Sequence, residues 1–233
     1  MKAKIKDKKE IAQGTLMATF DLQGKEVKFK PGQYFYITLK NPPYHDSKGA
    51  IRHFSIVNSP NEKGIITMAT RIRDSAFKKS LSEMPIGSEV EIDSIGGSFV
   101  LPSKTDRPLV FFAGGIGVTP FMSMFRYIKE EKLPYKILFI YSNRDQSSTA
   151  FYSELKRLNT PDLKIIFVMT QDSQWKGENR HIDQNLIRDY AKDLSGSAYY
   201  LAGPQDLVKS IFDELIKAGV KLSQITTENF SGY

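Results

Sequence analysis

Short runs of apolar, β-branched and aromatic residues, separated by turn residues, dominate the first hundred positions. An amphipathic patch over 75–84 interrupts them and predicts a helix that ends before Pro85 and Gly87. Several short strands with turns at this spacing indicate a small antiparallel barrel or sandwich. The expected strands cover 34–39, 54–57, 65–70 and 88–92.

From Asp106 onward the pattern changes to near-continuous apolar runs, which are typical of strands buried on both faces of a parallel sheet. Helical periodicity alternates with these runs, and the alternation predicts βαβ units with right-handed crossovers. The polar segment 102–106 separates the two patterns, so we expect two domains, 1–104 and 105–233. Strands are expected at 109–113, 136–141, 164–169 and 199–202, and helices at about 120–131, 149–158, 183–191 and 204–218.

Composition narrows the class of protein. The 233 residues are 40% hydrophobic and 25% charged, with no apolar run near the ~20 residues that span a bilayer. The basic N-terminus leads into no apolar segment, so we expect a cytoplasmic protein without a secretory signal. Cysteine is absent, which excludes thiolate metal sites and Cys-bound iron–sulfur clusters within the sequence, and the three histidines lie far apart. We expect no metal site.

The net charge of +7 is concentrated partly in the first ten residues, which contain alternating lysines. Such a run favours a plain solvated strand or tail, because alternating lysines commonly protect an edge strand from pairing. No basic helix with interleaved aromatic residues is present, so nucleic-acid binding is not expected. The charge instead suits an acidic protein partner, although solubility alone is an alternative explanation.

The segment AGGIGVTP, residues 113–120, joins an apolar run to an amphipathic one. Glycines at such a turn let the backbone approach a pyrophosphate and expose N–H groups. Pro120 stands where the dinucleotide fingerprint has its third glycine, and it fits a first helical turn that Thr119 can cap. We interpret this as a nucleotide-binding turn rather than a ligand-free one, with Gly115, Ile116, Gly117, Thr119 and Pro120 as binding residues.

Two more strand ends carry candidate nucleotide contacts. Arg144 follows the second apolar run, where a NAD site would have an acidic residue, and it favours the 2′-phosphate of NADPH. A solvated loop arginine is the alternative, and Asp145 follows it directly. Arg180, after the third run, adds weight to NADPH. Ala202, Gly203 and Pro204 form a second glycine turn at a later strand end.

Four motifs in this order resemble the ferredoxin–NADP reductase-like flavoprotein superfamily. RHFS at 52–55 is similar to its flavin-binding Arg-x-Tyr-Ser/Thr motif, and 114–120 to its pyridine-nucleotide loop. Residues 202–204 resemble its Cys/Ala-Gly-Pro turn, and ENFSGY at 228–233 its C-terminal aromatic segment. The resemblance covers essentially the whole chain. It implies a six-stranded antiparallel barrel that binds FAD and a five-stranded parallel α/β domain that binds NADPH or NADH.

The resemblance assigns roles in the flavin site. Arg52 would bind the FAD pyrophosphate, with a surface ion pair as its alternative, and Ser55 would hydrogen-bond flavin N5. Phe54 replaces the usual Tyr and would pack on the flavin. At the next strand end and helix start the family's glycine is absent, and Lys78 stands where a hydroxyl is usual. The cofactor-binding set there comprises Arg52, His53, Phe54, Ser55, Thr70, Arg71, Ser75, Ala76, Phe77 and Lys78.

In the second domain, Ala202 replaces the cysteine that some relatives place beside the nicotinamide. Glu228 would relay a proton or lie near the nicotinamide, or it is simply an exposed strand-end carboxylate. Phe230 or Tyr233 would cover the flavin, although Phe230 fits a core position equally well. The expected catalytic residues are Ser55, Glu228 and Phe230.

The function implied is an FAD-dependent NAD(P)H oxidoreductase that passes hydride to flavin N5. With no cysteine in the sequence, electrons are expected to leave for a separate acceptor, most readily an acidic ferredoxin or flavodoxin. One alternative is reduction of free flavin or a ferric chelate, which are small-molecule acceptors. Another is a non-enzymatic electron-transfer subunit that binds FAD. The sequence leaves the oligomeric state open.

Overall fold

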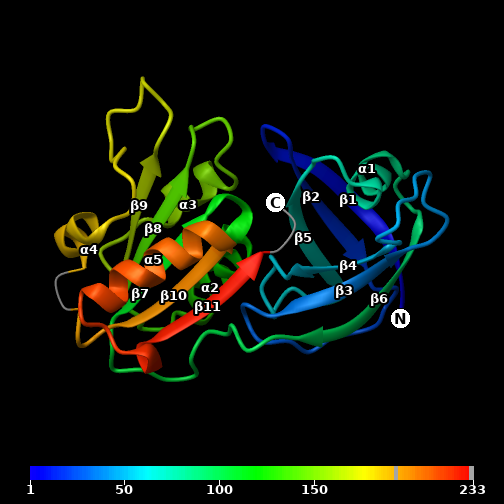
Figure 1. Ribbon diagram of the computed structural model, residues 1–233. Coiled ribbons are helices and arrows are strands. Elements are labelled where there is room, and N and C mark those ends of the chain that lie inside the picture. The colour runs from blue at the N-terminus through cyan, green and yellow to red at the C-terminus, as the bar shows by residue number, and fades with distance from the viewer. Residues whose placement is uncertain (192–193, 231–233) are drawn as a thin grey trace. The chain divides into compact units, whose positions relative to one another are not determined.

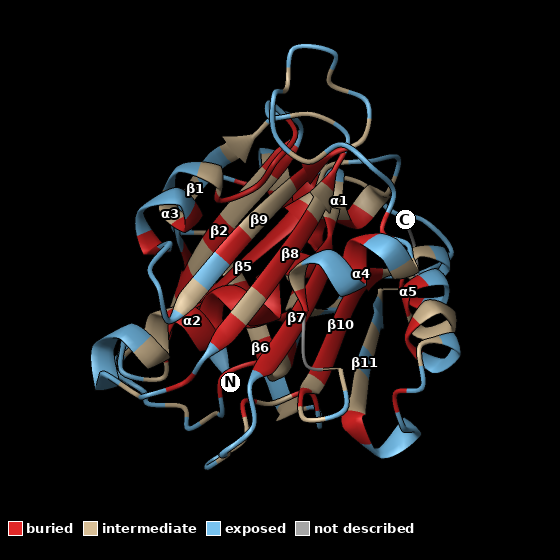
Figure 2. Cartoon of the chain, turned by 90° about the vertical axis from the view of Figure 1, so that its left-hand side faces the viewer, coloured by how far each residue is buried: buried red, intermediate tan, exposed pale blue. Residues whose placement is uncertain are grey.

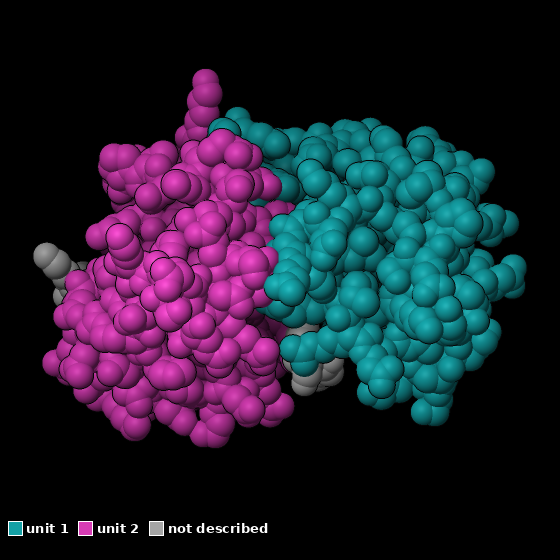
Figure 3. All heavy atoms as spheres, turned by 90° about the horizontal axis from the view of Figure 1, so that it is seen from above, with its two compact units in different colours: residues 1–101, 119–130 teal, residues 102–118, 131–233 magenta. Residues whose placement is uncertain are grey.

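The computed structural model describes residues 1–191 and 194–230, and the chain divides into two compact units (Figure 3). The barrel unit contains residues 1–101 and 119–130, and the sheet unit contains 102–118 and 131–233. The first change of unit lies close to the expected boundary after residue 104. The helix at 119–130, however, groups with the barrel, which gives that unit two separate chain segments.

The barrel unit is built on a six-stranded antiparallel sheet with strand order β4-β3-β6-β1-β2-β5 (Figure 1). This confirms the expected barrel-like fold. A backbone hydrogen bond from Val57 to Thr67, 2.8 Å long, links the chain beyond β4 to β5. The strands are β1 (Lys2–Ala12), β2 (Thr15–Asp21), β3 (Tyr34–Leu39), β4 (Ile51–Ser55), β5 (Ile65–Arg71) and β6 (Glu89–Gly96).

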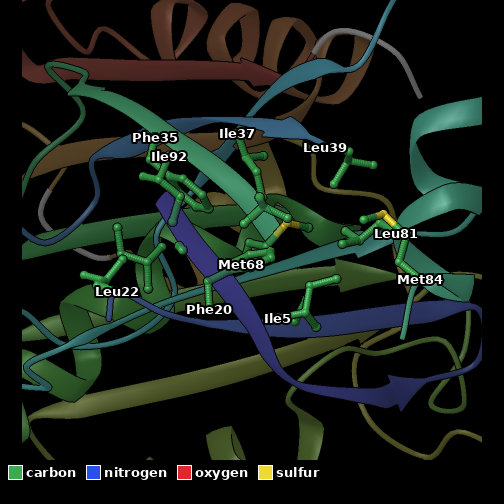
Figure 4. Packing of buried hydrophobic residues seen from close by; sticks show 14 of the residues in the cluster. Ile5, Phe20, Leu22, Phe35, Ile37, Leu39, Met68, Leu81, Met84 and Ile92 are labelled. Carbon is green, nitrogen blue, oxygen red and sulfur yellow. The ribbon is translucent and has the colours of Figure 1, made fainter. Parts of the chain in front are cut away.

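Alternating residues of these strands form the core of the barrel unit. Phe20, Phe35, Ile37, Met68 and Ile92 are each at most 1% exposed, and Figure 4 shows them gathered between the strands. The rings of Phe20 and Phe35 meet edge to face at 6.2 Å. Because strand residues alternate between faces, the neighbours of Phe35 and Ile37 along β3 are more exposed, whereas β5 is buried on both faces around Met68.

The lysine-rich first strand has a different place from the one expected. β1 pairs with β2 on one side and with β6 on the other, so it is an inner strand, and the edge-strand interpretation is wrong. Lys8 is also structural. Its Nζ donates to three carbonyls at the end of α1 (Ala76–Glu83), those of Leu81, Ser82 and Met84, at 3.2, 2.6 and 2.6 Å. A cation at this end stabilises the helix dipole and its unpaired carbonyls.

The helix α2 (Thr119–Glu131) packs within the barrel unit over its first twelve residues. Ser123 donates to the carbonyl of Asn58 at 2.8 Å, and Phe121 meets Phe99 edge to face at 5.4 Å. A Cβ on Gly32, whose φ is +100°, would lie 2.2 Å from the backbone carbonyl oxygen of Phe99 and 2.5 Å from Cε of Met124. A glycine is therefore required just before β3, where the chain approaches the backbone of Phe99.

The sheet unit contains a five-stranded parallel sheet with order β11-β10-β7-β8-β9, as expected. Figure 2 shows β7 and β10 buried along most of their length. The apolar runs predicted only the other four strands, because four of the six residues of β11, ITTENF, are polar. The strands are β7 (Leu109–Gly114), β8 (Ile137–Asn143), β9 (Leu163–Met169), β10 (Ala198–Pro204) and β11 (Ile225–Phe230).

One face of this sheet packs on α4 and α5 through aliphatic side chains, including Val110, Ile140 and Ile211. The other face is aromatic, with Phe111 against Tyr200 at 5.2 Å. Within the described residues no helix is long and apolar enough to cross a membrane. The remaining elements are η1 (Gly115–Val118), α3 (Tyr152–Leu158), α4 (Gln184–Tyr190), α5 (Gln205–Lys217) and η2 (Leu222–Gln224).

Candidate functional site

β4 directs its side chains to two different surroundings. The guanidinium carbon of Arg52 lies 5.4 Å from the ring centre of Phe77 on α1, and the ring of Phe54 lies 5.7 Å from the same ring. His53 instead lies between Tyr34 and Tyr36, at 5.3 and 5.6 Å. Strand alternation thus brings Arg52 and Phe54 to α1 and separates His53 from them.

Ser55, the last residue of β4, has a buried hydroxyl. Ser55 is only 3% exposed, and its Oγ has no hydrogen-bond partner. An unmet buried hydroxyl destabilises a protein by about 1–3 kcal/mol, so it is expected to serve a ligand. The residues present therefore fit a flavin cofactor, whose polar ring edge would satisfy this group.

The start of α1 collects positive charge. Burial, with the nearby Arg73 and Arg52 guanidinium groups, lowers the pKa of Lys78 to about 8. The side chain of Ser75 caps the helix by accepting from the N–H of Lys78 at 3.5 Å. Cations beside the first turn of a helix are a setting in which phosphate binds well.

Thr70 and Arg71 end β5, as expected, and their backbones pair with Leu16 and Thr15 of β2. Thr70 is 1% exposed, and its hydroxyl makes a long 3.4 Å contact with the carbonyl of Arg71. The structure thus ties Thr70 into the barrel wall. A contact with FAD at these two positions stays a prediction.

The two glycine turns of the sheet unit pack against each other. A Cβ on Gly117 would lie 2.3 Å from the carbonyl oxygen of Ala202, and one on Gly203 would lie 3.1 Å from the backbone of Gly114. Gly115 has a φ of +52°, which favours glycine. The chain is already helical at η1, and Thr119 is the first residue of α2, so it does not cap the helix from outside as expected. Pro120 lies in the first turn, where it is tolerated.

Glu228 is the most unusual carboxyl group of the sheet unit. It lies beside Ala202 in the β10–β11 pairing, which places it at the Ala202–Pro204 turn. Its Oε2 is buried without a hydrogen-bond partner, and burial raises the pKa of Glu228 to about 7. A carboxyl group with this pKa can hold or release a proton near neutral pH. The exposed-carboxylate interpretation is wrong.

Phe230 pairs with Pro204 at the end of the described chain and is half-buried. Ser231, Gly232 and Tyr233 of the C-terminal motif lie outside the described residues. Whether Phe230 or Tyr233 covers the flavin therefore stays a prediction.

The end of β8 holds a residue that the sequence reasoning missed. Asn143 is 6% exposed, and neither Nδ2 nor Oδ1 of its side chain has a partner. The next residue, Arg144, is exposed. Asp145 is held by its own loop, since its carboxylate accepts from Ser147 and Ser148, which lowers the pKa of Asp145. Only the placement of an amide at a strand end could have drawn attention to Asn143.

Arg180 is engaged by two carboxylates. It makes a two-point contact with Glu178, at 3.0 and 2.7 Å, and a further one with Asp189 at 2.9 Å. The guanidinium holds the pKa of Glu178 down to about 2. Because these carboxylates engage Arg180, Arg144 is the one of the two arginines that still favours NADPH. Across the described ranges, no group of three or more His, Cys, Asp or Glu side chains could hold a metal ion.

Comparisons with known proteins agree with these two half-sites. Residues 2–100 match the oxidoreductase FAD-binding domain, and residues 111–213 match the oxidoreductase NAD-binding domain. Fold and site together define a flavin-dependent pyridine-nucleotide oxidoreductase. The chain belongs to the oxidoreductases that combine an FAD-binding domain with an NAD-binding domain, and its fold is ferredoxin reductase-like.

Solved structures share the fold at low identity. The flavohem-like FAD/NAD-binding domain of nitric oxide dioxygenase from Vibrio cholerae O1 biovar El Tor matches with a TM-score of 0.86 and 16% identity, covering 98% of each chain. A ferredoxin NADP+ reductase from Neisseria gonorrhoeae, with bound FAD and NADP, matches with a TM-score of 0.83 and 19% identity, again over 98% of each chain.

Curated relatives are longer proteins. Flavohemoprotein B of Dictyostelium discoideum is 24% identical over 89% of this chain and 53% of its own length. The glycine betaine monooxygenase reductase subunit of Chromohalobacter salexigens is 26% identical over 87% of this chain and 56% of its own length. The chain thus spans about half the length of these relatives.

Proposed function

We propose that the protein oxidises NAD(P)H through FAD and passes the electrons to a separate acceptor, a ferredoxin or flavodoxin. One observation carries the proposal: each unit has an unpartnered buried polar group beside an anion-binding turn. In the barrel unit this is Ser55, which ends the same strand, β4, that carries Arg52, and in the sheet unit it is Glu228 beside the Ala202–Pro204 turn.

The bound flavin supplies the acceptor for hydride and the ability to release electrons singly or in a pair. The chain's own residues bind and orient the flavin, and one of them holds a proton. Arg52 and the start of α1 hold phosphate, and Ser55 offers a fixed hydrogen bond to the cofactor. Glu228 keeps a proton near neutral pH because burial disfavours its charged form.

Three observations support an acceptor outside these two domains. The sequence contains no cysteine to bind an iron–sulfur cluster. Its net charge of +7 complements an acidic partner. Relatives include the glycine betaine monooxygenase reductase subunit, and the fold matches a ferredoxin reductase in carbazole 1,9a-dioxygenase, with a TM-score of 0.84.

A haem protein is the second candidate acceptor, because the matched relatives include several flavohemoproteins. The effect of salt on the rate of electron transfer is expected to distinguish the two acceptors. An encounter between this basic protein and an acidic ferredoxin weakens as salt screens the charges.

We also propose a preference for NADPH. Arg144 supplies an exposed cation at the end of β8, and Asp145 is engaged within its own loop. The unpartnered amide of Asn143 beside it is suited to a sugar hydroxyl. Arg180 does not enter this argument, because two carboxylates already engage it.

Anaerobic mixing of the FAD-loaded protein with NADPH and, separately, NADH tests the function. We expect the visible flavin band to bleach, faster with NADPH. Ferredoxin, flavodoxin, a haem protein and free FMN are then offered as acceptors at low and high salt. Ferredoxin or flavodoxin should reoxidise the flavin fastest at low salt. A protein that takes up FAD but does not bleach is an electron-transfer subunit, and fast turnover of FMN alone identifies a flavin reductase.

A further inference from the structure

Residues 43–50, part of the loop between β3 and β4, are fastened along α1. The backbone N–H of Tyr44 donates to Ser80 Oγ at 3.0 Å, and Ser80 Oγ donates back to the carbonyl of Tyr44 at 3.2 Å. The Tyr44 hydroxyl donates to Glu83 at 2.7 Å, and Lys79 Nζ lies 3.9 Å from the Tyr44 ring centre. This loop is therefore held in a fixed place relative to the first turn of the helix.

The fixed loop brings the carboxylate of Asp46 to the start of α1. Oδ2 of Asp46 accepts from the backbone N–H of Ala76, the first residue of the helix, at 3.1 Å. Oδ1 lies 3.7 Å from Nη2 of Arg52 and accepts from the N–H of Lys48 at 2.9 Å. One carboxylate thus bridges a helix-start N–H and a guanidinium, the two kinds of donor that phosphate uses in proteins.

Nη1 of Arg52 is also engaged within the chain. Nη1 of Arg52 donates to the carbonyls of Lys48, Gly49 and Ile51, at 2.9, 3.0 and 2.6 Å. The first two of these belong to the same loop as Asp46. The loop therefore surrounds Arg52 with oxygen atoms, one of which carries charge.

The balance of charge explains why a carboxylate is stable here. Arg52, Arg73 and Lys78 gather at this helix start, and the two guanidinium groups help to lower the pKa of Lys78. Such a cluster is stabilised by a nearby anion. Asp46 provides one negative charge, whereas the pyrophosphate of FAD would provide two.

We propose that Asp46 competes with the flavin phosphate: its carboxylate occupies the anion-binding position formed by the Ala76 N–H and Arg52, and it must withdraw when FAD binds. This rests on the proposed FAD-dependent function. Two anions cannot share this position, since like charges at contact distance repel. Asp46 therefore weakens FAD binding and stabilises the FAD-free barrel unit.

The test compares FAD with riboflavin, which has no phosphate. The variant Asp46→Asn keeps an oxygen acceptor for Ala76 but removes the charge, and Asp46→Ser does the same with a smaller side chain. Asp7→Asn is the matched control, because Asp7 is an exposed residue of β1 and its change alters net charge equally. FAD-free proteins are titrated with each ligand, and flavin fluorescence gives Kd.

We expect both Asp46 variants to bind FAD about tenfold more tightly, a change of about 1.4 kcal/mol, with riboflavin binding unchanged. Asp7→Asn should leave both affinities unchanged. FAD-free Asp46→Asn should also melt at a lower temperature than the wild type, and added FAD should raise its melting temperature by more.

Unchanged or weaker FAD binding by the two Asp46 variants would overturn the proposal, and would make Asp46 a positioning residue for Arg52. An equal gain for FAD and riboflavin would overturn it too, because the effect would not act through phosphate. These outcomes are separate from a failure of the proposed function. That failure appears as FAD-loaded wild-type protein that NADPH and NADH do not bleach.

Discussion

A methyl group added to Gly117 would lie 2.3 Å from the carbonyl oxygen of Ala202. The glycine turn after β7 and the glycine turn after β10 are thus in direct contact. The two turns therefore share one rigid structure at the carboxyl edge of the sheet, where open α/β sheets bind their ligands.

We predict that Gly117→Ala destabilises the protein by about 1–3 kcal/mol, because the added methyl group forces the two turns apart. NADPH binding should weaken while FAD binding is retained. Urea unfolding and separate titrations of the two nucleotides measure both effects.

Gly219→Ala is the control for Gly117→Ala. Gly219 has a φ of +90° but nothing within 4 Å of an added Cβ, so this change introduces backbone strain without a clash. NADPH binding should be unaffected by it. Equal loss of NADPH binding in both variants would show that the contact with Ala202 is unimportant.

The pKa of Lys78, lowered to about 8, makes FAD binding dependent on pH. Below about pH 8 the side chain is charged and attracts phosphate, and above it the charge is lost. The affinity for FAD should therefore fall as pH rises through about 8. Lys78→Arg should bind FAD without this pH dependence, whereas Lys78→Gln should bind it roughly tenfold more weakly than the wild type below about pH 8 and about equally well at higher pH. FAD titrations of the three proteins between pH 6 and 10, roughly two units on each side of that pKa, measure this pH dependence.

The pKa of Glu228 is raised, whereas that of Lys78 is lowered. Its folded pKa of about 7 lies above the ordinary value of 4.5, so the folded state keeps its proton while the unfolded carboxyl is already ionised. Stability from this group is complete below about pH 4.5 and is lost as pH rises through about 7. Glu228→Gln stays neutral and should escape this loss. The melting temperature of the variant minus that of the wild type should therefore increase from pH 5 to about pH 7 and then level off. A difference independent of pH would contradict the assignment.

Arg144→Gln should raise the KM for NADPH by roughly 10- to 100-fold and leave the KM for NADH nearly unchanged, because only NADPH carries a 2′-phosphate. Arg180→Gln is the matched control. It should lower stability by breaking the contacts with Glu178 and Asp189 without altering the ratio of the two KM values. If Arg180→Gln instead abolishes the preference, our assignment of the phosphate to Arg144 is wrong.

The sequence predicted the two domains and most strands because hydrophobic periodicity records which face of an element is buried. The run 34–39 was expected in full, since YFYITL alternates clearly. β1 was misplaced because its lysines report exposure of one face and say nothing of pairing at its two sides. A strand's place in a sheet depends on residues far away, here Val90 and Ala18, which pair with Ala3 and Lys8.

The candidate site was predictable only as far as its motifs extend. Arg52, Ser55 and the glycine turns follow recognisable patterns. Asn143 and Asp46 belong to no pattern, and their interest comes from three-dimensional facts: an amide without partners, and a carboxylate at a helix start. Arg180 shows the converse, because a candidate cation became engaged once the fold brought Glu178 and Asp189 to it.

The two-segment make-up of the barrel unit sets the order in which the protein can be completed during synthesis. Strand β1 is made first, but its second neighbour, β6, begins only at Glu89. The helix α2 that packs against Phe99 and Asn58 follows later still, after β7 has already been made. The ribosome therefore begins the second unit before it has finished the first. A fragment ending at Leu101 would keep all six strands of the barrel unit yet leave Phe99 without its helix partner.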